Sequence, residues 1–253
     1  NNKIWNAFRL VKGWEQDDIE QPVVNKIAVS WFEAKLKEVN EELNEQFRQY
    51  RISEALMNVY RLFWDEFSGW YLEMVKPEYG KPIDKVTYQA TFHFFDVLLK
   101  MLHPFMPFIT EELWHHIYER KEGESIMRAT LKVDSLDDDN RRLLKDIEIV
   151  KQVVAGVRAV RNERNIAQKN KLVLQVVGQD HIAVYADVVM KMANLKSIDI
   201  VNEKASDASA FLVGTDSYAV PLGDLIDVKA EIEKQEKELQ HLEGFLAGIK
   251  KKL

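Results

Sequence analysis

The most apolar passage of the sequence, residues 94–117, places the strongest constraint on the fold. Within it, apolar residues recur at spacings of three and four, which puts them on one face of a helix. These residues are Phe95, Leu98, Leu99 and Leu102. The helix ends at His103, because the residue before a proline is pushed out of the α region. A second helix follows, which begins either with Pro104 or Pro107 in its first turn or at Thr110, whose hydroxyl suits a cap. Both starts predict two helices that meet at a buried corner.

Similar apolar stripes predict a helical bundle around this hairpin. The expected helices of the first part of the chain cover residues 1–13, 25–47, 50–75, 85–102 and 106–120. All six tryptophans of the chain lie in this part. Five antiparallel helices that carry large aromatic side chains are typical of a bundle.

The composition changes after an extended connector that ends in an acidic run, and we place a domain boundary near residues 135–140. The segments that follow are expected to form a helix, a strand, a helix and three strands, in that order. They cover residues 140–164, 172–177, 181–193, 197–201, 210–214 and 218–222. Gly214–Ser217 is the predicted hairpin turn between the last two strands.

From Asp224 onward the sequence has the heptad pattern of a coiled coil. Its seam residues alternate steps of three and four, and a single glutamine interrupts the apolar series. They are Leu225, Val228, Ile232, Gln235, Leu239, Leu242, Leu246, Ile249 and Leu253. An isolated seam would leave these side chains in water, so its partner helix lies either downstream or in another molecule.

The predicted fold class is therefore α+β and mainly α. Residues 1–135 form the helical bundle, residues 136–223 a small unit of order αβαβββ, and residues 224–253 the first helix of a truncated coiled coil.

Composition excludes several classes of function. The 253 residues include no cysteine, so disulfides, thiolate metal sites and cysteine nucleophiles are impossible; this fits a reducing, cytoplasmic compartment. No apolar run reaches the roughly 18 residues that a membrane helix needs. The net charge of −6 argues against a wholly electrostatic nucleic-acid binder, yet residues 141–171 hold nine Lys or Arg against three Asp or Glu. This segment is a possible phosphate-facing patch or a solvated helix face.

No constellation of residues indicates an active site. Glycine-rich phosphate loops are absent, and the three histidines at 103, 115 and 116 are interpreted as surface or core residues, with no metal expected. The aromatic stripe that includes Trp64, Phe67 and Trp70 is either a shelf for stacking bases or part of the core.

Four motifs, in the same order, resemble class I aminoacyl-tRNA synthetases of the valyl, isoleucyl and leucyl group. NKIWNAFRLV and FWDEFSGWYLEMVKP are similar to the first and third helices of their anticodon-binding domain, and HPFMPFITEELWH resembles its last hairpin. VRAVRNERNIAQKNKL looks like an arginine-bearing segment of the valyl and isoleucyl enzymes, although Gln168 replaces the usual proline before Lys169. The heptad tail resembles the C-terminal coiled coil of the bacterial-type valyl enzymes. The tail and the lack of cysteine favour the valyl group.

The resemblance implies a module that binds tRNA, with the anticodon loop held on the bundle. Its implied tRNA-binding residues are Asn6, Arg9, Lys12, Trp70, Trp64, Arg158, Arg161, Arg164, Lys250 and Lys251. An amide can pair two ways with a base edge, and a guanidinium can contact a base or a phosphate. The three arginines of residues 158–164 step by three along a helix, so they contact either phosphates or acidic residues of the bundle.

The resemblance also defines what this chain is not expected to do. The ATP-binding motifs of the family are absent, so we expect no catalytic residue and no cofactor here, whereas the parent ligase uses ATP with Mg²⁺. The expected partner is valine-specific tRNA, without a membrane. The parent is expected to be a monomer, and the truncated coiled coil could self-associate. The alternatives are a helical scaffold or adaptor that dimerises without RNA, or the equivalent part of an isoleucyl enzyme.

Overall fold

The computed structural model describes residues 2–178 and 182–223, which fall into two compact units. The first unit comprises residues 1–151 and 182–192, and the second comprises residues 152–181 and 193–253. The predicted coiled coil, residues 224–253, lies outside the described residues. The proposed division at residues 135 and 223 stays a prediction.

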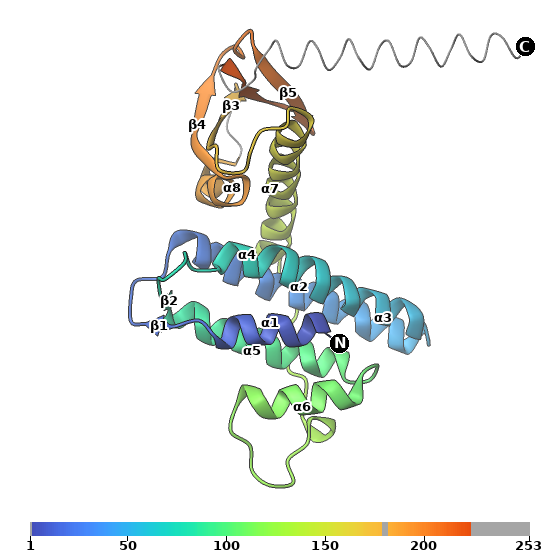
Figure 1. The fold of residues 1–253 in the computed structure, drawn as a ribbon. Helices are drawn as coiled ribbons and strands as arrows, with labels where there is room; N and C mark the ends of the chain where they lie inside the picture. The colour runs from blue at the N-terminus through green and yellow to red at the C-terminus, as the bar shows by residue number, and fades with distance from the viewer. Residues whose placement is uncertain (1, 179–181, 224–253) are drawn as a thin grey trace, which may run out of the picture. The chain divides into compact units, whose positions relative to one another are not determined.

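The first unit contains the five helices that the apolar stripes predict (Figure 1). They are α1 (Asn2–Lys12), α2 (Val23–Arg48), α3 with its continuations (Ile52–Val75), α5 (Lys85–Leu102) and α6 (Pro107–Ile117). Helix α1 runs alongside α5 and forms one outer layer of the bundle. The predicted helix boundaries agree with the structure to within a few residues.

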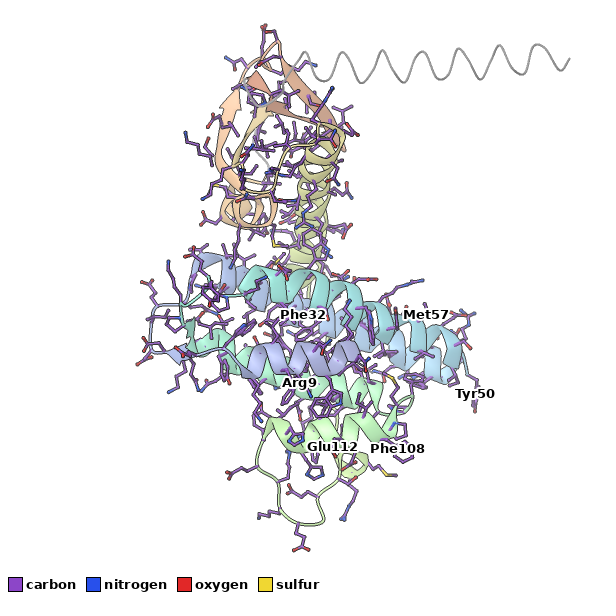
Figure 2. All side chains as sticks on the ribbon, in the orientation of Figure 1. Arg9, Phe32, Tyr50, Met57, Phe108 and Glu112 are labelled. Carbon is purple, nitrogen blue, oxygen red and sulfur yellow. The ribbon has the colours of Figure 1, made fainter. Side chains whose placement is uncertain are left out.

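An aromatic core holds these helices together. The Phe32 ring of α2 lies 5.1 Å from the rings of Phe67, Tyr71 and Phe94, measured between centroids. All four side chains are buried, and Figure 2 shows Phe32 inside the bundle. Burial of a ring of this size contributes roughly 1.5–3 kcal/mol, so this core is the main reason that α2 and α5 enclose the third helix.

The third helix differs from the single helix predicted over residues 50–75. It consists of α3 (Ile52–Arg61), a π-helix η1 (Leu62–Tyr71) and a final turn α4 (Leu72–Val75). The Ser68 hydroxyl donates to the Phe63 carbonyl five residues earlier, at 2.9 Å. The wider turn changes the direction in which the side chains of η1 point, including the two tryptophans that the sequence singled out.

A short parallel pair of strands fixes the end of α1. Strand β1 (Gln16–Asp17) pairs with β2 (Ile83–Asp84), and neither strand was predicted from the sequence. The buried Asp84 accepts a hydrogen bond from the Thr87 backbone at 2.7 Å, which caps α5, and another from the Asn25 amide at 2.8 Å. These contacts tie the segment after α1 to the start of α5.

The structure decides between the two starts of α6. The helix begins at Pro107, in the first turn, where a missing N–H does least harm. Thr110 is buried, and its hydroxyl donates to the Met106 carbonyl at 2.8 Å and lies 2.7 Å from His103 Nδ1. The side chain therefore joins the two helices of the hairpin instead of capping the second one.

Helix α7 (Asp138–Glu163) begins in the first unit and ends in the second. The connector before it contains one turn of 3-10 helix, η2 (Ile126–Arg128). Buried Lys151 places its ammonium 4.8 Å from the Trp31 ring and pairs with Glu66. The first half of α7 thus packs on the bundle through a lysine within its apolar stripe.

The second unit carries a four-stranded sheet of order β4-β3-β6-β5. Its strands are β3 (Leu172–Val177), β4 (Leu195–Val201), β5 (Ala208–Val213) and β6 (Asp216–Pro221). Strand β3 is parallel to β4 and antiparallel to β6. The hairpin between β5 and β6 turns at Gly214, whose φ of +59° favours glycine. Between β3 and β4 lie η3 (Ala183–Tyr185) and α8 (Ala186–Ala193), so the predicted order of elements is confirmed.

Candidate nucleic-acid interface

Helix α1 presents one polar face to solvent because its apolar residues share the opposite face. Ile4, Phe8 and Val11 are buried, whereas Asn6 and Arg9 are exposed. Lys3 and Lys12 are exposed as well, so three cations and no carboxylate lie on this helix. Figure 2 shows Arg9 on the outside of the bundle. A local excess of positive charge at the surface suits a phosphate backbone.

The cations of α1 lie against aromatic rings. The Arg9 guanidinium is 5.5 Å from the Trp5 centroid, and Lys12 Nζ is 5.6 Å from the Phe8 centroid. Lys3 Nζ lies 5.8 Å from the Trp64 ring and donates to the Trp64 carbonyl at 3.1 Å. Such contacts cover the apolar stems while the charged groups remain in water. The charges are therefore held in place before any ligand binds.

The two candidate tryptophans contact different helices. Trp64 is half-buried, stacks on Tyr60 with centroids 4.4 Å apart, and meets Lys3 of α1. Trp70 is also half-buried, and its ring lies 5.6 Å from Lys151 Nζ on α7. Trp64 therefore lies next to the polar face of α1, whereas Trp70 lies next to α7.

The three candidate arginines of α7 and its end are not equivalent. Arg158 and Arg164 are exposed. Arg161 is 2% exposed and donates to the carbonyls of Ala167 and Asn170 at 3.0 and 2.9 Å. Two partners were predicted for Arg161, a phosphate or an acidic residue of the bundle. The structure shows neither, because the guanidinium donates to backbone carbonyls instead. Lys250 and Lys251 lie outside the described residues.

Lys3 was not predicted as part of this interface, although the sequence contains a signal for it. Lys3 precedes Asn6 by three residues, as Asn6 precedes Arg9, and this spacing places all three on one side of a helix. The row on α1 therefore consists of Lys3 and the three predicted residues, Asn6, Arg9 and Lys12.

The histidines of α6 pair with carboxylates on their own helix. His115 Nε2 lies 3.1 Å from Glu111, and His116 Nε2 lies 3.3 Å from Glu112. Among the described residues, no group of three or more His, Cys, Asp or Glu could hold a metal ion. A search of the same residues finds no helix long and apolar enough to cross a membrane.

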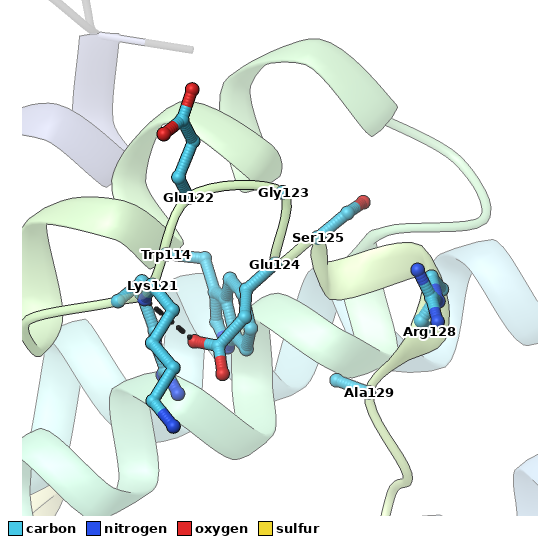
Figure 3. Close-up of a pocket in the computed structure, with 9 residues that line it drawn as sticks. Trp114, Lys121, Glu122, Gly123, Glu124, Ser125, Arg128 and Ala129 are labelled. Carbon is cyan, nitrogen blue, oxygen red and sulfur yellow. Dashed lines mark hydrogen bonds between the residues drawn. The ribbon is translucent and has the colours of Figure 1, made fainter.

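A hollow of about 440 Å³ lies beside the loop that follows α6 (Figure 3). The Arg120 guanidinium at its wall is 3.6 Å from the Trp114 centroid and bonds Asp96 at 3.2 Å. Glu124 accepts a hydrogen bond from the Lys121 backbone at 3.1 Å. Three cations and two carboxylates line this hollow, so its net attraction for an anion is smaller than that of α1.

Comparison with known proteins identifies the family to which this chain belongs. The family described as the anticodon-binding domain of tRNA ligase matches residues 30–177. A valine–tRNA ligase from Phocaeicola vulgatus is 55% identical over 253 residues, and one from Parabacteroides distasonis is 56% identical over 254 residues. A more distant valine–tRNA ligase, from Fervidobacterium nodosum, is 31% identical over 262 residues. Each match covers 100% of this chain and 29% of the relative. The chain therefore belongs to the anticodon-binding domain family of tRNA ligases.

Proposed function

We propose that this chain is the tRNA-recognition part of a valine–tRNA ligase and that it binds the anticodon loop on the polar face of α1. The observation that supports this most directly is the row of Lys3, Asn6, Arg9 and Lys12, which carries no acid. The surrounding residues 1–140 hold 17 Lys or Arg against 25 Asp or Glu. A cationic row on this acidic stretch gives an RNA a favoured place to bind.

The chemistry of the row suits an unpaired loop. Sequence-specific RNA recognition favours loops whose bases are unstacked and exposed at their edges. The Asn6 amide offers a donor and an acceptor to a base edge, while Arg9 and Lys12 offer charge to phosphates. Trp64, beside Lys3, provides a ring on which a base can stack.

The remaining parts of the proposal concern the parent protein. Attachment of valine to its tRNA, with ATP and Mg²⁺, is assigned to polypeptide outside this chain, in a cytoplasmic and monomeric ligase. The relatives reported above carry the name valine–tRNA ligase, which favours the valyl over the isoleucyl alternative. The scaffold hypothesis gains no support from them, and self-association through residues 224–253 is testable by sedimentation.

A binding titration tests the proposal. A fluorescent anticodon stem-loop RNA with a valine anticodon is titrated with the wild-type chain and with Asn6→Ala and Arg9→Ala. We expect each variant to bind about tenfold more weakly, a loss of roughly 1.4 kcal/mol. Arg48→Ala, an exposed arginine at the end of α2, is the matched control and should bind as the wild type does.

Two results would contradict the proposal. One is the absence of binding by the wild-type chain at low salt. The other is equal affinity of the wild type and of the two α1 variants, which would mean that the RNA binds elsewhere. A stem-loop with a scrambled anticodon shows whether the interaction reads sequence.

A further inference from the structure

A second hollow, of about 330 Å³, lies at the C-terminal end of α1, beside the row of cations. Its lining includes Lys12 of α1, Gln16 of β1, Tyr88 and Gln89 of α5, and Tyr118 after α6. The volume lies at the lower end of the range of about 300–1,000 Å³ for pockets that hold small molecules. The cavity is therefore a candidate for a group of about the size of one nucleobase.

Aromatic side chains form the apolar part of this pocket. The Tyr88 ring lies 4.8 Å from that of buried Phe92, which holds Tyr88 against the bundle. Tyr118 is 43% exposed, and the Arg120 guanidinium lies 5.3 Å from its ring. Burial raises the pKa of both phenols, so both are neutral at physiological pH. Neutral rings of this kind offer faces on which a base can stack.

Two primary amides supply polar groups at the same pocket. Gln16 is fixed by its pairing with Ile83, and Gln89 follows Tyr88 on the first turns of α5. Each amide carries both a donor and an acceptor, as the edge of a nucleobase does. The lining contains no carboxylate, and Lys12 is its one lysine, so nothing in it repels a phosphate.

Contacts link the pocket to the proposed anticodon-binding row. His116, which also lines the pocket, lies 5.9 Å from the Trp5 ring, and Trp5 supports the Arg9 guanidinium. Lys12 belongs to both the row and the pocket. Lys12 therefore connects the row on α1 to the cavity.

We propose that this pocket takes one unstacked base of the anticodon loop, and this inference rests on the function proposed above. The base lies against the rings of Tyr88 and Tyr118, its edge meets the amides of Gln16 and Gln89, and Lys12 binds the adjacent phosphate. Asn6 and Arg9 hold the loop, whereas the pocket discriminates between bases at one position. None of the four aromatic and amide residues was among those that the sequence predicted.

The test crosses changes in the RNA with changes in the protein. Three stem-loops each lack the base at one anticodon position, and each is titrated with the wild type, Gln89→Ala and Tyr118→Ala. Both side chains are exposed, so the variants should fold, which circular dichroism verifies. We expect one of the abasic RNAs to bind the wild type at least tenfold more weakly. In both variants this penalty should fall to less than threefold, while the penalties at the other positions persist.

Gln49→Ala is the matched control, since Gln49 is an exposed glutamine at the end of α2. It should retain all three abasic penalties of the wild type. If the variants also retain all three penalties, or weaken every RNA by the same factor, the pocket does not read a base and the inference is overturned. In both of these cases the wild type still binds its stem-loop, so the proposed function survives. If the wild type binds none of the RNAs, the proposed function itself fails.

Discussion

The guanidinium of Arg161 joins three segments of the second unit. It donates to Ala167 and Asn170 in the loop before β3, and to the carbonyls of Ala193 and Asn194 at 3.3 and 3.4 Å. Asn194 has a φ of +52°, so the guanidinium also stabilises an irregular turn. Burial lowers the pKa of Arg161, but a guanidinium remains charged in proteins. The arginine thus holds the loop before β3 and the turn after α8 against the end of α7.

Replacement of Arg161 by methionine should destabilise the second unit. The substitution removes a donor from four carbonyls, of which those of Ala167 and Asn194 keep a backbone donor, and it costs roughly 2–4 kcal/mol. Arg161→Lys should recover only part of this, because an ammonium lacks the planar fork of donors. Urea unfolding monitored by circular dichroism measures the change. Arg164→Met, at an exposed position, should lie within about 0.5 kcal/mol of the wild type; equal stability of the two methionine variants would contradict the structural role.

Tyr185 provides a residue whose ionisation reports on the first unit. Burial, followed by a hydrogen bond of 2.9 Å to Asp146, raises its pKa from 10.0 to about 12. Because the unfolded chain ionises first, the stability that this tyrosine contributes is complete below pH 10 and is lost as the pH rises toward 12. Asp146→Asn should bring the pKa back toward 10. The pKa is measured from the phenolate absorbance of the wild type and of Asp146→Asn, each after subtraction of the absorbance of the same protein with Tyr185→Phe. An equal pKa in the two proteins would show that Asp146 has no influence on Tyr185.

At the residue scale, the sequence predicts exposure better than it predicts partners. The spacing of Ile4, Phe8 and Val11 places them on one face of a helix. The same helical period then places Asn6 and Arg9 on the opposite face, toward solvent. Arg161 lies within the apolar stripe of α7, and its role depends on carbonyls more than 30 positions away. The local sequence pattern around Arg161 therefore cannot predict these hydrogen-bond partners.

Among the elements, the helices of the bundle follow from apolar periodicity, but the π-helix does not. A stretch of ten residues contains too few turns to distinguish its period from that of an α-helix. The choice depends on tertiary contacts, since Phe67 lies 5.1 Å from Phe32 of α2 and 4.9 Å from Phe95 of α5 within the aromatic core. The pair β1 and β2 escapes prediction for a related reason, because two residues cannot show an alternating pattern.

Two glycines in helices should respond oppositely to alanine. A Cβ at Gly156 of α7 would lie 2.2 Å from a ring carbon of Phe211 on β5, so Gly156→Ala should cost roughly 1–3 kcal/mol by overpacking. A Cβ at Gly69 of η1 would find its nearest neighbour at 3.5 Å, so Gly69→Ala should stabilise by about 0.5–1 kcal/mol. Thermal unfolding measures both changes.

The double variant Gly156→Ala with Phe211→Leu separates overpacking from a loss of helix geometry. Leucine shortens the opposing side chain, so the cost of Gly156→Ala should be smaller in this background than in the wild type. An equal cost in both backgrounds would mean that α7 and β5 do not approach each other as closely as the structure describes.

For the whole molecule, the distribution of charge matters more than its sum. The chain has a net charge of −6, yet α1 carries three cations without an acid. An RNA bound at α1 therefore meets a local excess of positive charge although the chain as a whole is acidic, which favours binding at this face. The sequence shows the charges, but their grouping with Trp5, Trp64 and the neighbouring pocket depends on the packing of α1 against α5, η1 and α6.

This distribution predicts how the affinity for the anticodon stem-loop depends on salt. Each phosphate contact releases counterions, and for a single strand it contributes about −0.7 to the slope of log K against log salt. Lys12→Gln should therefore make the slope shallower by about 0.7, whereas Asn6→Ala should weaken binding at every salt concentration and leave the slope unchanged. The charge of Lys26, an exposed lysine on α2, serves as the control, and Lys26→Gln should leave both slope and affinity unchanged. When a lysine that contacts a phosphate is replaced by glutamine, that phosphate keeps its counterion and the slope becomes shallower. Equal slopes for the wild type and Lys12→Gln would therefore place the phosphate backbone away from the end of α1.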